Sequence, residues 1–300
     1  MGRNEGRTGG RGVLSHLGEK FRLLLVLIKF EHTVFALPFA LMSALVAADG
    51  WPTGWQLLWI VVAMVGARSS AMAFNRLADE EFDRLNPRTA HRPLPAGLLT
   101  RTQVWAFTLA SGAVLILAAA MLNPLAFALS PVALAMVWGY SYTKRFTDWS
   151  HLLLGLCLAI APVGAWIAVR GEFALPPLIL AAAVMLWVAG FDIIYACQDV
   201  DFDRRIGLHS LPARWGIGPA LGVSRGLHAI MVGLLWWFRQ AAGLGPVYLA
   251  GVVLVAGLLI YEQSLVKPQD LSRVNAAFFT VNGFIGLGLL LFTAGDVFVP

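Results

Sequence analysis

Two short acidic segments carry the residues best suited to chemistry. Eight of the chain's 17 acidic residues fall in them: Asp79, Glu80, Glu81 and Asp83, then Asp192, Asp199, Asp201 and Asp203. In the first segment Asn75, Asp79 and Asp83 recur at every fourth residue. The second segment repeats this spacing, beginning at Tyr195 and ending at Asp203. Residues four apart share one face of a helix, so each segment presents a polar face over two turns.

Metal and phosphate binding would account for these two acidic faces. Facing carboxylates repel each other unless a cation neutralises them, and Mg²⁺ takes one or two carboxylates while bridging to substrate phosphates. Basic side chains near the acids can bind phosphate oxygens directly. They are Arg84, Arg88, Arg92, Lys144, Arg145 and Arg204. The pattern predicts a metal–diphosphate site; the plainer alternative is two solvated helix ends balanced by nearby arginines.

Two further ionisable residues, Arg68 and Asp192, lie inside apolar stretches. A charge within a membrane span is costly and usually functional, so both are candidates for the site. The alternatives are an Arg68 side chain that reaches the interface, or a structural ion pair between the two residues.

A weak internal repeat links the two segments. Phe-Asp-Arg occurs at 82–84 and again at 202–204, and each copy is followed by a histidine and Leu-Pro-Ala. This repeat suggests that the two carboxylate faces are opposed across a cavity.

The composition excludes a soluble protein. Apolar residues make up 58% of the 300 residues and charged residues 13%, with a mean hydropathy of +0.72. Cys157 and Cys197 lie in apolar stretches, so they imply neither a disulfide framework nor a metal site. The net charge of +5 is spread between apolar spans, which favours contact with membrane lipid over nucleic-acid binding.

The apolar stretches predict an all-α polytopic membrane protein with nine transmembrane helices around a central cavity that opens at the cytoplasmic side. Stretches of about 20 apolar residues cross a bilayer as helices. The nine expected spans are 30–48, 54–74, 104–121, 125–142, 151–169, 176–197, 217–238, 245–263 and 274–296. Leu122–Asn123–Pro124 is expected to be a tight turn. Residues 1–20 are expected to be a disordered cytoplasmic tail, and 21–300 a single transmembrane domain.

Lysine and arginine set the expected orientation. They concentrate in the first 30 residues and in the loops after the second, fourth, sixth and eighth spans, whereas the opposite side offers only Arg170 and Arg239. Because cytoplasmic loops carry the excess of positive charge, the N-terminus is expected in the cytoplasm.

Taken together, these residues resemble the UbiA family of intramembrane aromatic prenyltransferases over about residues 22–295. The first family motif is matched by Asn75, Asp79 and Asp83, followed by Asn-Pro-Arg-Thr at 86–89. The second is matched by Asp192, Tyr195, Asp199 and Asp203, and a basic loop by the run from Tyr140 to Arg145. The resemblance implies transfer of a prenyl group from a polyprenyl diphosphate to an aromatic acid, in the inner (cytoplasmic) membrane of a bacterium.

One departure from the family pattern concerns Arg76, which stands where an aspartate is common. It removes a candidate metal ligand and adds a candidate phosphate ligand. The Asn-Arg form resembles a bacterial subgroup that includes 4-hydroxybenzoate polyprenyltransferases and members assigned to the menaquinone route. The expected acceptor is therefore 4-hydroxybenzoate or 1,4-dihydroxy-6-naphthoate.

The resemblance implies a role for each candidate residue. Two Mg²⁺ ions would be held, one by Asn75, Asp79 and Asp83 and the other by Asp199 and Asp203. The catalytic candidates are Asp192, Tyr195 and Arg68. The substrate-binding candidates are Asn75, Arg76, Arg88, Arg92, Tyr140, Lys144, Arg145, Arg204 and His209.

Two other functions remain open at this point. A prenyltransferase acting on haem or a chlorophyll precursor would keep the chemistry and change the acceptor. A cation-coupled transporter would also place acids in membrane helices, although such sites tend to lie near the midplane on broken helices.

Overall fold

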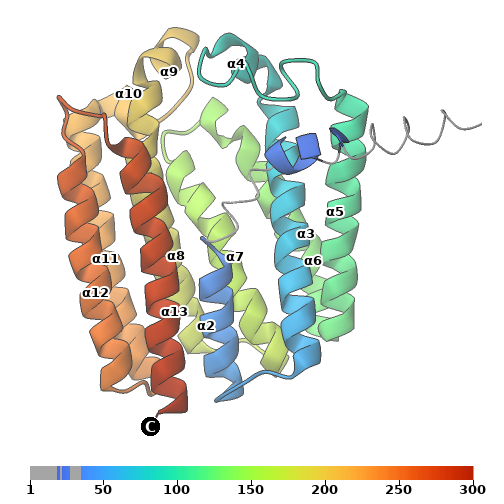
Figure 1. Ribbon diagram of the computed structural model, residues 1–300, viewed down its shortest axis with the longest axis vertical. Coiled ribbons are helices and arrows are strands. Elements are labelled where there is room, and N and C mark those ends of the chain that lie inside the picture. The colour runs from blue at the N-terminus through green and yellow to red at the C-terminus, as the bar shows by residue number, and fades with distance from the viewer. Residues whose placement is uncertain (1–18, 21, 28–34, 300) are drawn as a thin grey trace, which may run out of the picture.

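The structure is a computed structural model that describes residues 19–20, 22–27 and 35–299. In this part the chain is helical, and the one β-type pairing is an isolated bridge between Lys267 and Asp270. The expected tail at 1–20 lies outside the described residues except for 19 and 20. Figure 1 shows the helices packed side by side along the long axis of the molecule.

Eight described segments are long and apolar enough to cross a membrane. The long helices in them are α3 (Gly54–Ala78), α5 (Arg101–Leu122), α6 (Pro124–Gly139), α7 (Ser150–Arg170), α8 (Leu175–Ala196), α11 (Ile217–Ala242), α12 (Pro246–Leu265) and α13 (Asn282–Phe298). A shorter apolar helix, α2 (Leu37–Ala48), joins the bundle as the ninth member in the described part. It is the second half of the expected first span, of which residues 30–34 lie outside the described part.

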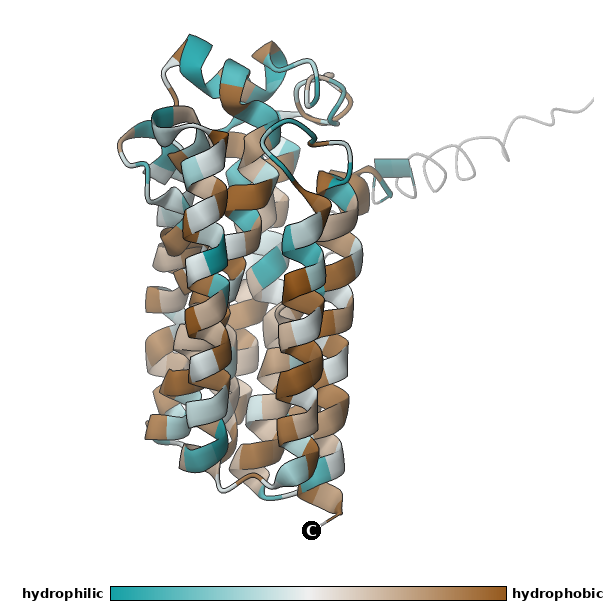
Figure 2. Ribbon diagram, turned by 90° about the vertical axis from the view of Figure 1, so that its left-hand side faces the viewer, coloured by the Kyte–Doolittle hydropathy of each residue, from teal (hydrophilic) through white to brown (hydrophobic). Residues whose placement is uncertain are grey.

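Short helices cover one end of the bundle, which we call the polar end. They are α4 (Glu80–Leu85), α9 (Val200–Ile206) and α10 (Leu211–Trp215). The 3₁₀ segments η2 (Tyr140–Arg145) and η3 (Cys197–Asp199) lead into this end, and the π-helical η4 (Ala276–Val281) opens the last span. Figure 2 shows hydrophobic residues along the helices and hydrophilic residues gathered at the polar end.

The most extensive contacts between helices mostly join helices that follow each other in the chain. α3 packs on α5, α5 on α6, α7 on α8, α8 on α11 and α12 on α13. α2 departs from this order, because it packs on α7 and on α13. The contacts of α2 therefore join the last helix to the middle of the bundle.

The expected turn at 122–124 is confirmed. α5 ends at Leu122, and the Asn123 side chain accepts a hydrogen bond from the backbone N–H of Ala126 at 2.9 Å. Pro124 is the first residue of α6, where its missing N–H costs nothing.

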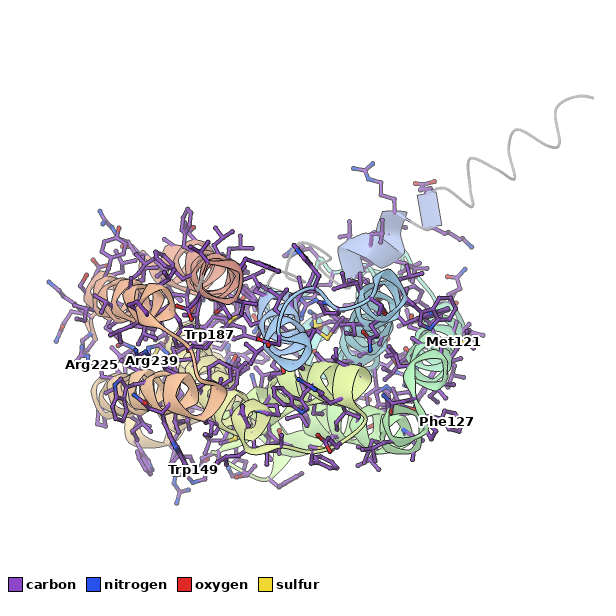
Figure 3. The ribbon with its side chains drawn as sticks, turned by 90° about the horizontal axis from the view of Figure 1, so that it is seen from below. Met121, Phe127, Trp149, Trp187, Arg225 and Arg239 are labelled. Atoms are coloured by element: carbon purple, nitrogen blue, oxygen red, sulfur yellow. The ribbon has the colours of Figure 1, made fainter. Side chains whose placement is uncertain are left out.

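The largest apolar cluster surrounds α8, the most buried of the candidate spans. Its Trp187 is fully buried, and Figure 3 shows it between the helices while Met121 and Phe127 lie at the outer edge. The Trp187 indole donates to Asn282 at 2.6 Å, and Asn282 donates to the buried Glu262 at 3.2 Å. These bonds tie α8, α12 and α13 together.

Both acidic segments interrupt a helix, contrary to the expectation of two continuous turns. α3 ends at Ala78 and α4 begins at Glu80, with Asp79 between them at φ −98° and ψ 5°. The Asp79 N–H still reaches the Asn75 carbonyl at 2.9 Å, and the Asp83 N–H reaches the Asp79 carbonyl at 2.7 Å. Because these i→i−4 bonds persist, the four-residue register survives the break.

The second segment breaks in a similar way. α8 ends at Ala196, η3 occupies Cys197–Asp199, and α9 begins at Val200. Each acidic segment is thus a span followed by a short helix at the polar end, which is consistent with the internal repeat (Figure 1).

Glycine allows α7 and α8 to approach closely. A Cβ placed on Gly155 would lie 2.2 Å from the carbonyl oxygen of Met185. No real Cβ tolerates that distance, so any larger residue must push the two helices apart.

We therefore expect Gly155→Ala to lower the free energy of unfolding by about 1–3 kcal/mol through overpacking. Thermal unfolding in detergent measures the effect. Gly164→Ala is the matched control, because it lies on the same helix and its Cβ would meet no atom within 4 Å. Equal melting temperatures for the two variants would contradict the close approach.

Candidate active site

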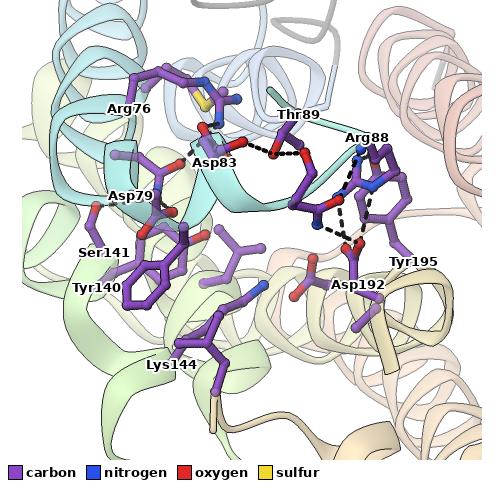
Figure 4. Close-up of a pocket in the computed structure, with 18 of the residues that line it drawn as sticks. Arg76, Asp79, Asp83, Arg88, Thr89, Tyr140, Ser141, Lys144, Asp192 and Tyr195 are labelled. Carbon is purple, nitrogen blue, oxygen red and sulfur yellow. Dashed lines mark hydrogen bonds and ion pairs between the residues drawn. The ribbon is translucent and has the colours of Figure 1, made fainter. Parts of the chain in front are cut away.

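A cavity of about 230 Å³ opens at the polar end and is lined from both acidic segments. Its charged lining residues are Arg68, Arg76, Arg88, Arg92, Lys144 and Arg145, with Asp79, Asp83, Asp192, Asp199 and Asp203. Figure 4 shows Arg76, Asp83, Arg88, Lys144 and Asp192 converging from α3, α4, the loop after α4, η2 and α8. Asp199 and Asp203 join the lining from η3 and α9. Residues separated by more than 100 positions in the sequence therefore share one cavity.

Asn75 and Asp79 form the first wall. The Asn75 amide donates to the Asp79 carboxylate at 3.0 Å and lies 3.5 Å from the Ser141 hydroxyl. Burial raises the pKa of Asp79 above its usual value, and the nearby Lys144 ammonium opposes that shift. Asp79 has no arginine partner at salt-bridge distance in the described part of the chain, so its carboxylate can accept an incoming cation.

Asp83, in contrast, is held by arginine. The Arg92 guanidinium donates to both Asp83 oxygens, at 2.7 and 2.8 Å, and Arg76 lies 3.8 Å from the same carboxylate. Arg76 is itself buried and donates to the Leu27 carbonyl at 3.4 Å. Arg76 thus contributes charge to the wall of the cavity and contacts the segment before α2.

Asp199, on the opposite wall, is clamped by Arg88. Two guanidinium nitrogens of Arg88 reach its two oxygens at 3.1 and 2.7 Å, and Asn86 donates to it at 3.3 Å. A third nitrogen of Arg88 donates to the Tyr195 hydroxyl at 3.0 Å (Figure 4). Burial lowers the pKa of Arg88, but the hydrogen bonds to Asp199 together with the nearby Tyr195, Asp199 and Asp83 raise the pKa overall.

Asp203 and Lys144 complete the charged lining. Asp203 is buried and accepts a hydrogen bond from Ser210 at 3.0 Å, with no arginine at salt-bridge distance among the described residues. Lys144 lines the same cavity as Asp192, Asp203 and Asp79. Its ammonium group therefore balances carboxylates from both walls.

Asp192 lies on α8 and is paired with a histidine that the sequence analysis overlooked. The His151 Nδ1 lies 2.7 Å from Asp192 Oδ2, and His151 has no exposed surface. No sequence spacing could predict this contact, because 41 positions separate the two residues. The one feature in the sequence that could have drawn attention to His151 is its place as a lone histidine at the start of an apolar span.

Arg68, Tyr140 and Arg145 also line the cavity. The Arg68 Nε is buried and has no hydrogen-bond partner among the described residues, so Arg68 can donate to a bound anion. No ion pair joins Arg68 to Asp192 in that part of the chain. Arg145 donates to the Ala78 carbonyl at 2.6 Å and lies over the Phe82 ring.

Arg204 and His209 do not line this cavity. Arg204 donates to the Ala213 carbonyl at 2.8 Å and borders a separate hollow together with Asp201. His209 pairs with Asp148 at 2.9 Å. Arg84, another basic residue expected to bind phosphate, is also outside the lining, because its side chain is exposed and pairs with Glu80 at 3.0 Å. The remaining candidates all line the cavity.

The rest of the cavity lining is largely apolar and aromatic. It includes Phe35, Leu154, Leu158, Val188, Phe191, Phe278 and Phe279. The rings of Tyr195 and Phe278 lie 4.3 Å apart, between the charged and the apolar lining. The cavity can therefore hold a molecule with a charged head and an apolar tail.

The oxygen donors of the cavity suit Mg²⁺. Asn75 supplies an amide oxygen, and Asp79 and Asp203 supply carboxylates that no arginine holds in the described structure. The described residues contain no cluster of three His, Cys, Asp or Glu side chains close enough to enclose a metal. Mg²⁺ bound through one or two carboxylates and substrate phosphates does not require such a cluster.

Comparison with known proteins gives consistent matches. The UbiA prenyltransferase family matches residues 36–285. The 4-hydroxybenzoate octaprenyltransferases of Citrobacter koseri and Burkholderia mallei are each 30% identical to this chain. The two alignments cover 82% and 86% of this chain, and 84% and 91% of the respective relatives.

Two solved structures share the fold. A UbiA homolog from Aeropyrum pernix has a TM-score of 0.80 and 37% identity, over 87% of this chain and 96% of its own. A UbiA homolog from Archaeoglobus fulgidus, bound to DMAPP and Mg²⁺, has a TM-score of 0.73 and 19% identity. The match covers 92% of this chain and 99% of that homolog.

The pairing of Asp83 with Arg92 gives a stability prediction. Arg92→Ala leaves a buried carboxylate with a distant partner, so we expect a loss of about 1–3 kcal/mol in detergent unfolding. Removing Asp83 as well recovers part of that loss, because the carboxylate that Arg92 compensated is then gone and Arg76 keeps its hydrogen bond to the Leu27 carbonyl. Arg84→Ala is the control, since Arg84 is 63% exposed and its pair with Glu80 contributes little. If the double variant loses as much free energy of unfolding as the Arg92 and Asp83 single variants lose together, the pairing is contradicted.

Proposed function

Because the chain belongs to the UbiA prenyltransferase family, we propose that it transfers a polyprenyl group from a polyprenyl diphosphate to the ring of an aromatic acid. The acceptor is 4-hydroxybenzoate or 1,4-dihydroxy-6-naphthoate, in the synthesis of ubiquinone or menaquinone. The observation that carries the proposal is one cavity lined by five carboxylates, six cations and several aromatic side chains. Membership of a prenyltransferase family sets aside the cation-coupled transporter.

The charged side chains of the cavity suit the diphosphate group. Arg68, Lys144 and Arg145 provide cations, and Arg88 and Arg92 come from the loop after α4. Asn75, Asp79 and Asp203 would hold Mg²⁺, together with Asp83 and Asp199 when their arginines turn to phosphate oxygens. Bound Mg²⁺ would neutralise negative charge on the leaving diphosphate.

The transfer step forms one bond and breaks one. The allylic C1–O bond breaks and its electron pair stays on the diphosphate, while an electron-rich ring carbon attacks C1. Fixed cations in the cavity stabilise the charge that develops on the leaving oxygen, and preorganised contacts of this kind usually contribute more to catalysis than any other effect. Asp192 orients the acceptor and takes the ring proton, and Tyr195 flanks the reacting carbon.

A product assay tests the proposal. Membranes containing the protein receive a radiolabelled polyprenyl diphosphate, Mg²⁺ and one of the two acceptors. We expect a labelled, prenylated aromatic acid with one acceptor, none in EDTA, and recovery when Mg²⁺ is restored. No labelled product with either acceptor, or undiminished activity in EDTA, would overturn the proposal.

Substitutions in the acidic segments separate cavity residues from exposed ones. Asp79→Ala and Asp199→Ala each remove a carboxylate from the cavity, so kcat should fall by about 10²–10³. Asp201→Ala and Glu81→Ala should lose little, because both side chains are exposed and outside the cavity lining. If Asp201→Ala proves as damaging as Asp199→Ala in protein that still folds, the assignment of the second segment is wrong.

We also propose that the polar end faces the cytoplasm of a bacterial inner membrane. Single cysteines at Leu98 and Arg205 mark the polar end, and one at Glu172 marks the opposite end; Cys157 and Cys197 are first replaced by alanine. In intact cells a membrane-impermeant maleimide should label position 172 alone. Labelling of 98 or 205 before the cells are permeabilised would reverse the orientation.

A further inference from the structure

The hydrogen bonds of His151 fix its tautomer. The backbone N–H of Leu211 points at His151 Nε2 over 3.4 Å, and a backbone N–H can only donate. Nε2 therefore accepts, and the ring proton lies on Nδ1. That Nδ1–H donates to Asp192 Oδ2 at 2.7 Å. The imidazole thus connects the start of α10 to a carboxylate in the cavity.

Asp192 is left with one oxygen for a substrate. Its side chain is 14% exposed and lines the cavity, and His151 is its one hydrogen-bond partner among the described residues. Because the imidazole holds Oδ2, the carboxylate cannot rotate freely, and Oδ1 is the acceptor that remains.

The surroundings hold the pair rigidly. His151 is fully buried at the start of α7, and the glycine contact at Gly155 locks α7 against α8 one turn further along. Leu154 and Leu158 follow His151 on α7 and line the cavity. The apolar wall beside Asp192 thus comes from the helix that carries the histidine.

From this geometry we infer that His151 is a positioning residue for the aromatic acceptor. It holds Asp192 so that Oδ1 meets the acceptor hydroxyl or the departing ring proton. His151 does not relay that proton, because its Nε2 is already occupied by the Leu211 N–H. The inference rests on the proposed function, since it assigns the acceptor to the Asp192 side of the same cavity.

Steady-state kinetics with both substrates varied test the inference. In His151→Ala, KM for the aromatic acceptor should rise roughly 10- to 100-fold through misplacement of Asp192. KM for the polyprenyl diphosphate should stay unchanged, because the cations of the cavity are intact. His151→Asn should restore most of the acceptor affinity, because its amide can donate to Asp192 from nearly the position of Nδ1.

His228 provides the matched control. It is another buried membrane histidine bonded to α8, through the Trp187 carbonyl at 3.2 Å, and it does not line the cavity. His228→Ala should leave the acceptor KM unchanged in the folded fraction isolated by gel filtration. A general packing defect would instead appear in both alanine variants.

The outcomes separate the two proposals. If wild-type protein is active and His151→Ala raises both KM values equally, or leaves both unchanged, the positioning role is overturned while the proposed function stands. His151→Asn as poor as His151→Ala also overturns it. Wild-type protein that prenylates neither acceptor overturns the proposed function and this inference with it.

Discussion

Compensation of buried charge is the constraint on which this structure depends. Five carboxylates and six cations line one cavity at the end of an apolar bundle. An unpaired charge in such surroundings is costly, so each group needs an opposite charge or a hydrogen bond. The breaks after α3 and α8 turn the acidic segments toward each other. The loop after α4 then brings Arg88 and Arg92 back over the opening, where each holds an aspartate through two guanidinium bonds.

Arg76 changes the sign of this balance. The cavity lining holds six basic and five acidic side chains; an aspartate at position 76 would make these five and six. The cavity of this chain therefore attracts an anion before any metal binds. Arg76 supplies that charge from a buried position beside Asp83, where it also donates to the Leu27 carbonyl. A bound cation has correspondingly less negative charge to neutralise.

Local patterns predicted much of this arrangement. Apolar runs predicted the helices, and Asn123 with Pro124 predicted the turn between α5 and α6. The four-residue spacing placed Asp79 and Asp83 in one cavity, although it could not reveal the break at Asp79, because the i→i−4 bonds run through it. The sequence could not predict which charged side chains pair with each other. Arg88 and Asp199 are 111 positions apart, and His151 meets Asp192 only because α7 packs on α8. The Arg204 side chain is of a type that binds phosphate, but from its position on α9 it donates to the Ala213 carbonyl instead.

The mixed lining of the cavity, charged and aromatic, also bears on where the products of the proposed reaction go. Diphosphate is a small polyanion that dissolves in water, whereas a prenylated acid carries a hydrocarbon chain. Each methylene of that chain favours an apolar phase by about 0.8 kcal/mol. The two products therefore prefer different phases, diphosphate the water and the prenylated acid the bilayer. Partition between the two phases keeps the products from meeting again, which suppresses the reverse reaction.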